Sequence, residues 1–277
     1  SVPSARRVVA LGDFAHLPDW SHTLAETECV VHLAGRAHVM HETDSGMEDY
    51  RRDNVVVSAH LAAAAESAGV RRFVYISSIK ALGEDRAIPY SEHDLPAPRS
   101  AYGRSKLESE QAIRAALRRT DAVIVRPPMI LGPGAKGNLP RLVQLASMGA
   151  CAPLPLGGVR NRRSFVFAGN LADAVFTCAT SEQAGNQTYH VADPEPMSTP
   201  DLLRAISRMR NQRLMLFTVP QQVLHTLARL AGFREEIERL LGTLLVETEK
   251  IEREVGRKAP FTFEDGLRTT LGLTAAS

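Results

Sequence analysis

The sequence predicts an α/β fold in which a parallel β-sheet is covered by helices on both faces and is joined to a smaller C-terminal lobe. Short apolar runs rich in Val and Ile alternate with longer segments of helical periodicity along the first half of the chain. The 277 residues suffice for one large domain or for a core with a second lobe. The 44% hydrophobic and 23% charged fractions are those of an ordinary globular chain.

The first part of the chain supplies the expected sheet. Four apolar runs bounded by charged or turn residues are predicted to be buried strands, at Val8–Leu11, Cys29–Leu33, Phe73–Ile76 and Ala122–Val125. Between them we expect an alanine-rich helix over Val55–Ala68 and an amphipathic helix over Ala101–Arg118 with Glu and Arg on its wet side. Strands and helices that alternate at this spacing indicate parallel strands joined by right-handed crossovers.

After Gly132 the sequence becomes rich in Pro and Gly, and we place the domain boundary there. Residues 1–131 form the expected sheet domain, and residues 132–277 form mostly the second lobe, with 159–191 returning to the core sheet. Thr199 is the expected N-cap of a helix that has Pro200 at its first position. We also expect a strand at Ser164–Phe167 and a further segment of the core at Gln187–Val191. The other expected helices are Leu139–Met148, one that begins at Asn170, Asp201–Met209, Gln221–Leu230 and Glu235–Leu245.

Charge and composition argue against several functional classes. The 33 basic and 31 acidic side chains give a net charge of +2, which is too balanced for a nucleic-acid surface. No apolar run approaches the length of a membrane span. The three scattered cysteines form no CxxC pair and fit a reducing cytoplasm, and the histidines around His32 match no zinc spacing. We expect no metal, no nucleic acid and no membrane partner.

One local pattern predicts chemistry. Tyr102 and Lys106 are four residues apart at the start of the Ala101–Arg118 helix, so they share a face. A tyrosine with a pKa of about 10 is a poor base, and a lysine ammonium one turn away favours its phenolate. Such a group can exchange a proton with a sugar hydroxyl or carbonyl while a nicotinamide exchanges hydride. Ser78, at the end of an apolar strand, would hold the same oxygen. The competing interpretation is an exposed Tyr and Lys at a helix end.

The whole series of motifs resembles the extended short-chain dehydrogenases, in particular the nucleotide-sugar epimerase/dehydratase/reductase family. The motifs occur in order as Asp13 after a strand, His32-Leu33-Ala34-Gly35, Tyr75-Ile76-Ser77-Ser78 with Gly83 five residues later, Tyr102 with Lys106, Arg126-Pro127-Pro128 before Gly132-Pro133-Gly134, and Arg163-Ser164-Phe165-Val166-Phe167. The resemblance implies a Rossmann-like doubly wound sheet, NAD or NADP as cofactor, a UDP-sugar substrate and a homodimer.

The resemblance also assigns roles to residues. Tyr102 becomes the acid or base, Lys106 holds the nicotinamide ribose, and Asp13 contacts the adenine. Ala34 and Gly35 line the pyrophosphate and ribose. Arg163 and Asn138 contact the substrate diphosphate, for which the arginine fork is suited. The complete set is Ser78, Tyr102 and Lys106 as catalytic residues; Asp13, Leu33, Ala34, Gly35, Ser77, Tyr102, Lys106 and Pro127 for the cofactor; and Ser78, Lys80, Asn138 and Arg163 for the substrate, with Arg160 and Arg162 as weaker candidates.

One family feature has no match before Asp13. The family begins with a strand, a glycine-rich turn and a helix that receive the pyrophosphate, so we expect this chain to be an N-terminally shortened copy of a longer enzyme. The segment Gly132–Gly137 matches GxGxxG, but Pro133 suits the tight turn poorly and no acidic residue follows at the required distance. We interpret it as a loop that leads to the substrate. A binding relative without catalysis remains the alternative of another class.

The residues after Ser78 reduce the number of reactions that the resemblance allows. The family's 4,6-dehydratases place Asp-Glu there, whereas this chain has Ile79-Lys80, which argues against dehydration. C4 epimerisation and keto-sugar reduction both need only Ser78, Tyr102 and Lys106. The resemblance favours reduction of a UDP-4-keto-6-deoxy-N-acetylhexosamine for bacterial surface polysaccharide, in part because Leu82 replaces the tyrosine common in epimerases. UDP-sugar 4-epimerisation with a tightly bound NAD is the second hypothesis, and NAD against NADP stays open.

Overall fold

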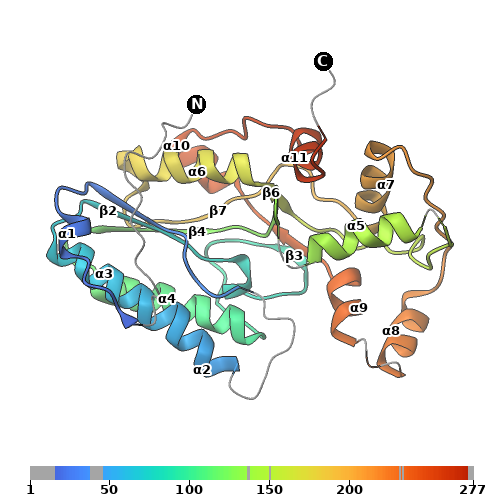
Figure 1. Cartoon of the computed structure of the whole chain (residues 1–277), viewed down its shortest axis with the longest axis horizontal. Coiled ribbons are helices and arrows are strands. Elements are labelled where there is room, and N and C mark those ends of the chain that lie inside the picture. Colours follow the sequence, from blue (N-terminus) through green and yellow to red (C-terminus); the bar gives the residue numbers. More distant parts are fainter. Residues whose placement is uncertain are drawn as a thin grey trace.

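The computed structural model of the chain contains a four-stranded parallel sheet at its centre (Figure 1). It describes residues 16–37, 46–135, 138–149, 151–230, 232 and 234–273. The strand order is β1-β2-β4-β7, and each neighbouring pair is parallel. The strands are β1 (Cys29–His32), β2 (Arg72–Ile76), β4 (Asp121–Arg126) and β7 (Thr188–His190). The expected strand Val8–Leu11 and Asp13 lie outside the described residues.

Helices cover both faces of this sheet, as the alternation of apolar runs and helical segments predicts. Phe73 and Tyr75 of β2 join one apolar cluster with the helices α3 and α4, whereas Val74 and Ile76 join another with α6 and α10. Figure 1 shows the sheet between these two pairs of helices. The doubly wound α/β fold is therefore confirmed. The helices are α3 (Val57–Ser67), α4 (Ala101–Ala116), α6 (Ala168–Thr180) and α10 (Glu249–Val255).

The helix that leads into α3 is longer than predicted. It begins with α2 (Gly46–Tyr50), passes through a π-helical segment at Arg51–Val56 and continues as α3. The wider π turn rotates the side chains between the two α-helical parts, and Asn54 becomes buried at 1% exposure. The short helix α1 (Ser21–Leu24) precedes β1 and packs near α3.

The C-terminal lobe has its own apolar core and lies beyond the carboxyl end of the sheet (Figure 1). Helix α5 (Asn138–Met148) packs against α7 (Thr199–Met209), and α8 (Gln221–Leu230) packs against α9 (Arg234–Leu241). Two small parallel pairs connect this lobe to the sheet domain. They are β3 (Arg86–Tyr90) with β8 (Leu244–Val246), and β5 (Met129–Leu131) with β6 (Phe165–Phe167); the remaining elements are α11 (Phe263–Thr270) and the 3₁₀ turns Ile79–Ala81 and Glu182–Ala184.

Three local predictions are corrected by the structure. Ser198, not Thr199, is the N-cap of α7, because its hydroxyl accepts from the Asp201 amide and Thr199 is already helical. The helix expected over Glu235–Leu245 ends at Leu241, and the following residues pair with β3 instead. The acidic Glu110 does not lie on a wet face of α4, since it is only 4% exposed.

Candidate active site

Four residues predicted to bind cofactor and the predicted catalytic residue Ser78 follow the carboxyl ends of three adjacent strands. Leu33 and Gly35 come after β1 and are exposed, Leu33 by 69%. Ser77 and Ser78 come directly after β2, and Pro127 comes directly after β4; all three are buried. Ligands of open parallel α/β sheets bind outside the carboxyl ends of the strands. The topology therefore brings these five residues to the edge of the sheet where a ligand is expected.

The start of α4 places Tyr102 against Ser78. The helix is capped by Ser100, whose hydroxyl accepts from the Gly103 amide at 3.1 Å. Gly103 lies so close to the 3₁₀ turn after Ser78 that a β-carbon there would be 2.4 Å from the carbonyl oxygen of Lys80. This contact leaves room only for glycine. In the resulting position the Tyr102 hydroxyl lies beside Ser78, whose side chain lowers the pKa of this phenol.

Lys106 lies one turn further along α4 and is 5% exposed. Its ammonium donates to the Tyr75 hydroxyl at 3.1 Å and to the Ile76 carbonyl at 2.9 Å, and it lies 4.6 Å from the centre of the Tyr75 ring. Burial lowers the pKa of Lys106, while the nearby Tyr102 and Glu110 oppose this change. Two of the three donors of the ammonium are thus committed to β2, which fixes the lysine head beside Tyr102.

The pKa of Tyr102 differs from the sequence-based expectation. Burial raises this pKa, and although the Lys106 charge and the neighbouring Ser78 side chain lower it, burial has the larger effect. The Lys106 charge therefore acts in the expected direction, but in the protein without ligands it does not outweigh burial. Tyr102 is a neutral phenol, and its hydroxyl proton is available for donation.

A hydrogen-bond network on β1, β2 and α3 supports Lys106. Burial raises the pKa of Tyr75, whereas the nearby Ser109 and Ser58 side chains lower it, and Ser58 is hydrogen-bonded to His32 Nε2 at 2.8 Å. Burial lowers the pKa of His32 to about 4, with a smaller contribution from Lys106, so this imidazole is neutral. His32 also stacks on the Tyr75 ring at 5.3 Å between centroids. The network keeps the Tyr75 hydroxyl in position to receive the lysine.

Asn54 connects the π-helical segment to the end of β1. Its side-chain oxygen accepts from the Arg36 amide at 2.7 Å, and its side-chain nitrogen donates to Ser105 on α4 at 3.0 Å. A β-carbon on Gly35 would lie 2.8 Å from the Asn54 oxygen and 3.7 Å from Lys106 Nζ. The backbone after β1 therefore passes directly beside the lysine head.

Ser77 is placed differently from Ser78. Its hydroxyl donates to the buried Glu110 and its amide donates to the Val125 carbonyl at 2.8 Å. Ser77 therefore has no free hydrogen-bond donor to offer a cofactor and could only accept, through its carbonyl or hydroxyl oxygen. Glu110 also accepts two hydrogen bonds from Arg126 at the end of β4.

The predicted substrate residues are more widely distributed. Lys80 lies on the 3₁₀ turn after Ser78 and pairs with Glu84 at 3.9 Å. Arg163 precedes β6, is half-buried and donates to the Gly242 carbonyl at 3.0 Å; burial lowers its pKa. Asn138 is the first residue of α5. The roles given to these three residues stay predictions.

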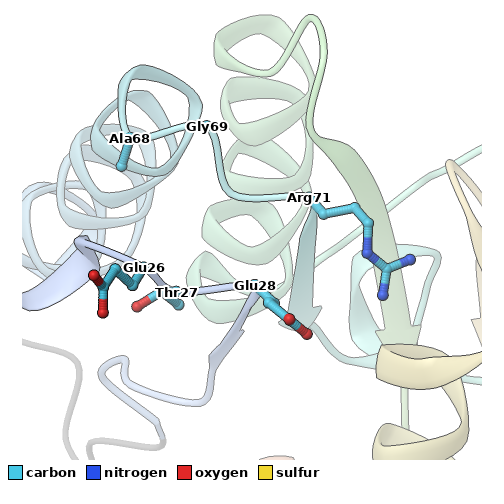
Figure 2. Close-up of a pocket in the computed structure, with 6 residues that line it drawn as sticks. All are labelled: Glu26, Thr27, Glu28, Ala68, Gly69 and Arg71. Atoms are coloured by element: carbon cyan, nitrogen blue, oxygen red, sulfur yellow. The ribbon is translucent and has the colours of Figure 1, made fainter.

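Two surface depressions lie outside this group. One, of about 330 Å³, brings Arg160 and Arg162 together with the beginning of α7. The other, of about 380 Å³, is shown in Figure 2 with Glu26, Glu28 and Arg71 beside it. It lies at the amino ends of β1 and β2, opposite to Ser78 and Gly35, and so is separate from the candidate active site.

Comparison with known proteins identifies the family. The family model described as "NAD dependent epimerase/dehydratase family" matches residues 4–192. The chain belongs to this family. A UDP-glucose 4-epimerase of Vibrio cholerae is 35% identical over 266 residues, 94% of this chain and 80% of the relative. An N-acetyl-α-D-glucosaminyl-diphospho-ditrans,octacis-undecaprenol 4-epimerase of Escherichia coli O157:H7 is 23% identical, over 95% of this chain and 82% of the relative.

Solved structures of other enzymes have the same fold. UDP-glucuronic acid 4-epimerase from Bacillus cereus, in complex with NAD, superposes with a TM-score of 0.74 at 17% identity over 93% of this chain and 78% of that chain. RMD from Pseudomonas aeruginosa, complexed with NADPH, has a TM-score of 0.69 at 20% identity over 88% and 80%. The chain is thus a member of an NAD(P)-dependent enzyme family, as the motif series predicts.

The side chains of this epimerase/dehydratase family member fit the nicotinamide end of such a cofactor. Lys106 offers a positioned ammonium, Gly35 provides backbone without a side chain beside it, and the Tyr102 hydroxyl lies next to Ser78. In the described part of the chain, no group of three or more His, Cys, Asp and Glu side chains could hold a metal ion. Nor does any helix in that part have the length and apolar character to cross a membrane.

Sequence reasoning missed four supporting residues of the site, Tyr75, Ser58, Asn54 and Glu110. Glu110 could have been found, because it repeats the four-residue step from Tyr102 to Lys106. Tyr75 gave a weaker signal, since a tyrosine in an apolar strand is ordinarily core. Asn54 gave none, because its direction depends on the π turn.

Proposed function

We propose that the protein catalyses NAD(P)-dependent hydride transfer at C4 of a UDP-sugar, and that its net reaction is reduction of a UDP-4-keto-6-deoxy-N-acetylhexosamine. The observation that carries this proposal is the contact of Tyr102 with Ser78 beside the fixed ammonium of Lys106. The replacement of a dehydratase's acidic pair by Ile79-Lys80 supports a reaction without loss of water.

The side chains fit the reduction direction. When bound, the reduced nicotinamide supplies hydride to the C4 carbonyl carbon. Ser78 donates a hydrogen bond to the carbonyl oxygen and orients it, and Tyr102 gives that oxygen its phenolic proton. The neutral form of Tyr102 favoured by burial is the form that this step needs. Lys106 then stabilises the phenolate left behind, because its positive charge is held one helical turn away.

A 4-epimerase is the second candidate, and the 35% identity with the Vibrio cholerae UDP-glucose 4-epimerase favours it. Epimerisation uses the same three residues in both directions. Tyr102 first takes the proton of the C4 hydroxyl, and it later returns a proton to the same oxygen when hydride comes back to the other face of C4. This reaction begins from the phenolate, which burial disfavours. The two candidates therefore differ in the protonation state from which Tyr102 starts.

The first experiment is to denature the purified protein and assay the supernatant for released nicotinamide cofactor. A protein without cofactor that oxidises NADH or NADPH only when a UDP-4-keto-sugar is added supports the reductase. One equivalent of NAD carried through purification, together with interconversion of UDP-hexoses, supports the epimerase instead. Absence of both reactions contradicts the proposal and leaves a binding role.

A matched pair of variants tests the assignment of Tyr102. Tyr102→Phe should abolish turnover and leave cofactor affinity within a few-fold, because only the hydroxyl is removed. Tyr50→Phe is the control, since this ring packs 6.1 Å from that of Tyr102. Turnover that survives in Tyr102→Phe contradicts the assignment.

We propose that the protein is a cytoplasmic homodimer that uses the exposed sides of α3 and α4, with residues 1–131 binding cofactor and the lobe after Gly132 binding the sugar nucleotide. Arg163 and Asn138 are proposed to meet the diphosphate, and Arg160 and Arg162 are positioned at a neighbouring depression.

A further inference from the structure

A buried ion pair connects the catalytic helix to the ends of two strands. The Glu110 carboxylate on α4 accepts from Arg126 Nε at 2.9 Å and from Arg126 Nη2 at 2.5 Å. The Ser77 hydroxyl donates to the same carboxylate. Both charged side chains are less than a tenth exposed. Three elements that form the site, α4, the end of β2 and the end of β4, therefore meet at one carboxylate.

We infer that Glu110 and Arg126 are positioning residues that hold Ser78 against Tyr102 and set the net charge beside Lys106. The inference rests on the proposed function for the reaction that the site performs, but the arrangement itself is visible without substrate. Neither residue is among those to which the sequence assigned a role.

The positioning argument follows from the connections of Glu110. Ser77, one of its partners, is the residue immediately before Ser78, and the amide of Ser77 donates to the Val125 carbonyl next to Arg126. A bidentate arginine and carboxylate pair fixes both distance and plane. Because Glu110 and Tyr102 belong to the same rigid helix, a carboxylate that fixes Ser77 also fixes Ser78 relative to Tyr102.

The buried charges near Tyr102 are unequal in number, with more cations than anions. Lys106 and Arg126 are two buried cations that share one buried anion, Glu110, and the Glu110 charge raises the pKa of Lys106 against the effect of burial. Loss of one partner of a buried pair leaves the other charge uncompensated. The other titratable or charged groups that face Lys106, Tyr102 or the pair are Tyr50 from α2, Tyr75 from β2, His32 from β1, His190 from β7 and Arg114 from α4.

The two single variants should therefore move the pKa of Tyr102 in opposite directions. Glu110→Gln leaves an unpaired cation and stabilises the phenolate, so the pKa falls. Arg126→Met leaves an unpaired anion, so the pKa rises. For a unit charge about two helical turns away, about 11 Å, and an effective dielectric constant of about 20, each change in the ionisation constant is about tenfold. The double variant should return to within about twofold of the wild type, because the two changes cancel.

The measurement is a near-ultraviolet titration of the protein without substrate, with the matching Tyr102→Phe protein subtracted in each background. Tyr75 interferes little, because burial raises its pKa to about 12. Arg72→Met is the matched control: Arg72 is 1% exposed, pairs with Asp121 and lies at the opposite end of β2. It should destabilise the fold without changing the titration of Tyr102.

A charge-conserving variant tests position apart from charge. Arg126→Lys keeps the positive charge but loses the bidentate geometry, so kcat should fall about tenfold with the pKa of Tyr102 and the KM nearly unchanged. If both single variants shift the pKa in the same direction, or no more than Arg72→Met does, the inference is wrong. An unchanged kcat in Arg126→Lys also overturns it.

The titration, unlike the kcat measurement, is independent of the identity of the substrate. Opposite shifts in the titration support the positioning role even if no UDP-4-keto-sugar is reduced, in which case only the proposed function fails. Reduction of the substrate without opposite shifts leaves the proposed function standing and overturns the inference.

Discussion

Replacement of Gly103 by alanine should damage the site, because the added methyl group would clash with the backbone of the turn after Ser78. An added β-carbon would lie 2.4 Å from the Lys80 carbonyl oxygen and 3.2 Å from Pro98 Cβ, so α4 or the 3₁₀ turn after Ser78 must move. Both obstacles belong to backbone or to a rigid ring. The distance between Tyr102 on α4 and Ser78 before the turn is therefore expected to change.

Two effects of opposite sign compete in Gly103→Ala. Helix propensity alone would stabilise the variant by about 0.5–1 kcal/mol. Overpacking against backbone costs about 1–3 kcal/mol, so it should prevail. We expect a net loss of about 1–2 kcal/mol, or a melting temperature lower by several degrees, at about 2–4 °C per kcal/mol.

Activity should fall further than stability, because a displacement of about 1 Å in a reacting group can cost about a hundredfold in rate. The assay is kcat and thermal unfolding of Gly103→Ala beside Gln111→Ala, an exposed control on the same helix. A Gly103→Ala protein that melts at or above the wild-type temperature with kcat within twofold would refute the steric argument.

Two further predictions concern the hydrogen bond from Lys106 to Tyr75 and the stability of the fold at low pH. Tyr75→Phe removes the hydroxyl that accepts from Lys106 at 3.1 Å, so kcat should fall about tenfold with an intact fold, as measured by kinetics and circular dichroism; an unchanged kcat would contradict it. The Glu66 carboxylate accepts from the amides of Arg118, Arg119 and Thr120, which lower its pKa from 4.5 to about 2. Its contribution to stability is therefore present above pH 4.5 and lost as the pH falls toward 2, and thermal unfolding of Glu66→Gln from pH 7 to pH 2.5 should show a weaker pH dependence than the wild type.

The sequence was sufficient to predict the main sheet and its covering helices, because these elements have strong periodic patterns. β2 is an uninterrupted apolar run, and α4 has both a clear amphipathic pattern and a serine cap. The strand expected at Ser164–Phe167 is confirmed as β6, but the pair of β3 and β8 was missed for the opposite reason. β3 contains Arg86 and Pro89, and β8 has three residues, so neither has a strand pattern without its partner.

The candidate site was predictable where its geometry is local. Tyr102 and Lys106 are brought together by the period of one helix, and Ser78 by the end of one strand. The environment of these residues could not be predicted in the same way. The neutral state of Tyr102 results from burial, and the burial of Glu110 depends on Arg126 arriving from β4, sixteen residues later. Such effects require the packed structure, because they depend on how much water each group has lost.

The buried lysine explains why these supporting groups are needed. An ammonium removed from water is costly unless hydrogen bonds and an opposite charge compensate for the lost solvation. Lys106 receives compensation from the Tyr75 hydroxyl, the Ile76 carbonyl and the charge of Glu110. All three partners belong to the protein itself, so the ammonium is in place before any ligand binds. In its proposed role of holding the cofactor ribose, Lys106 would thus be oriented already, with the cost of that orientation met during folding and not during binding.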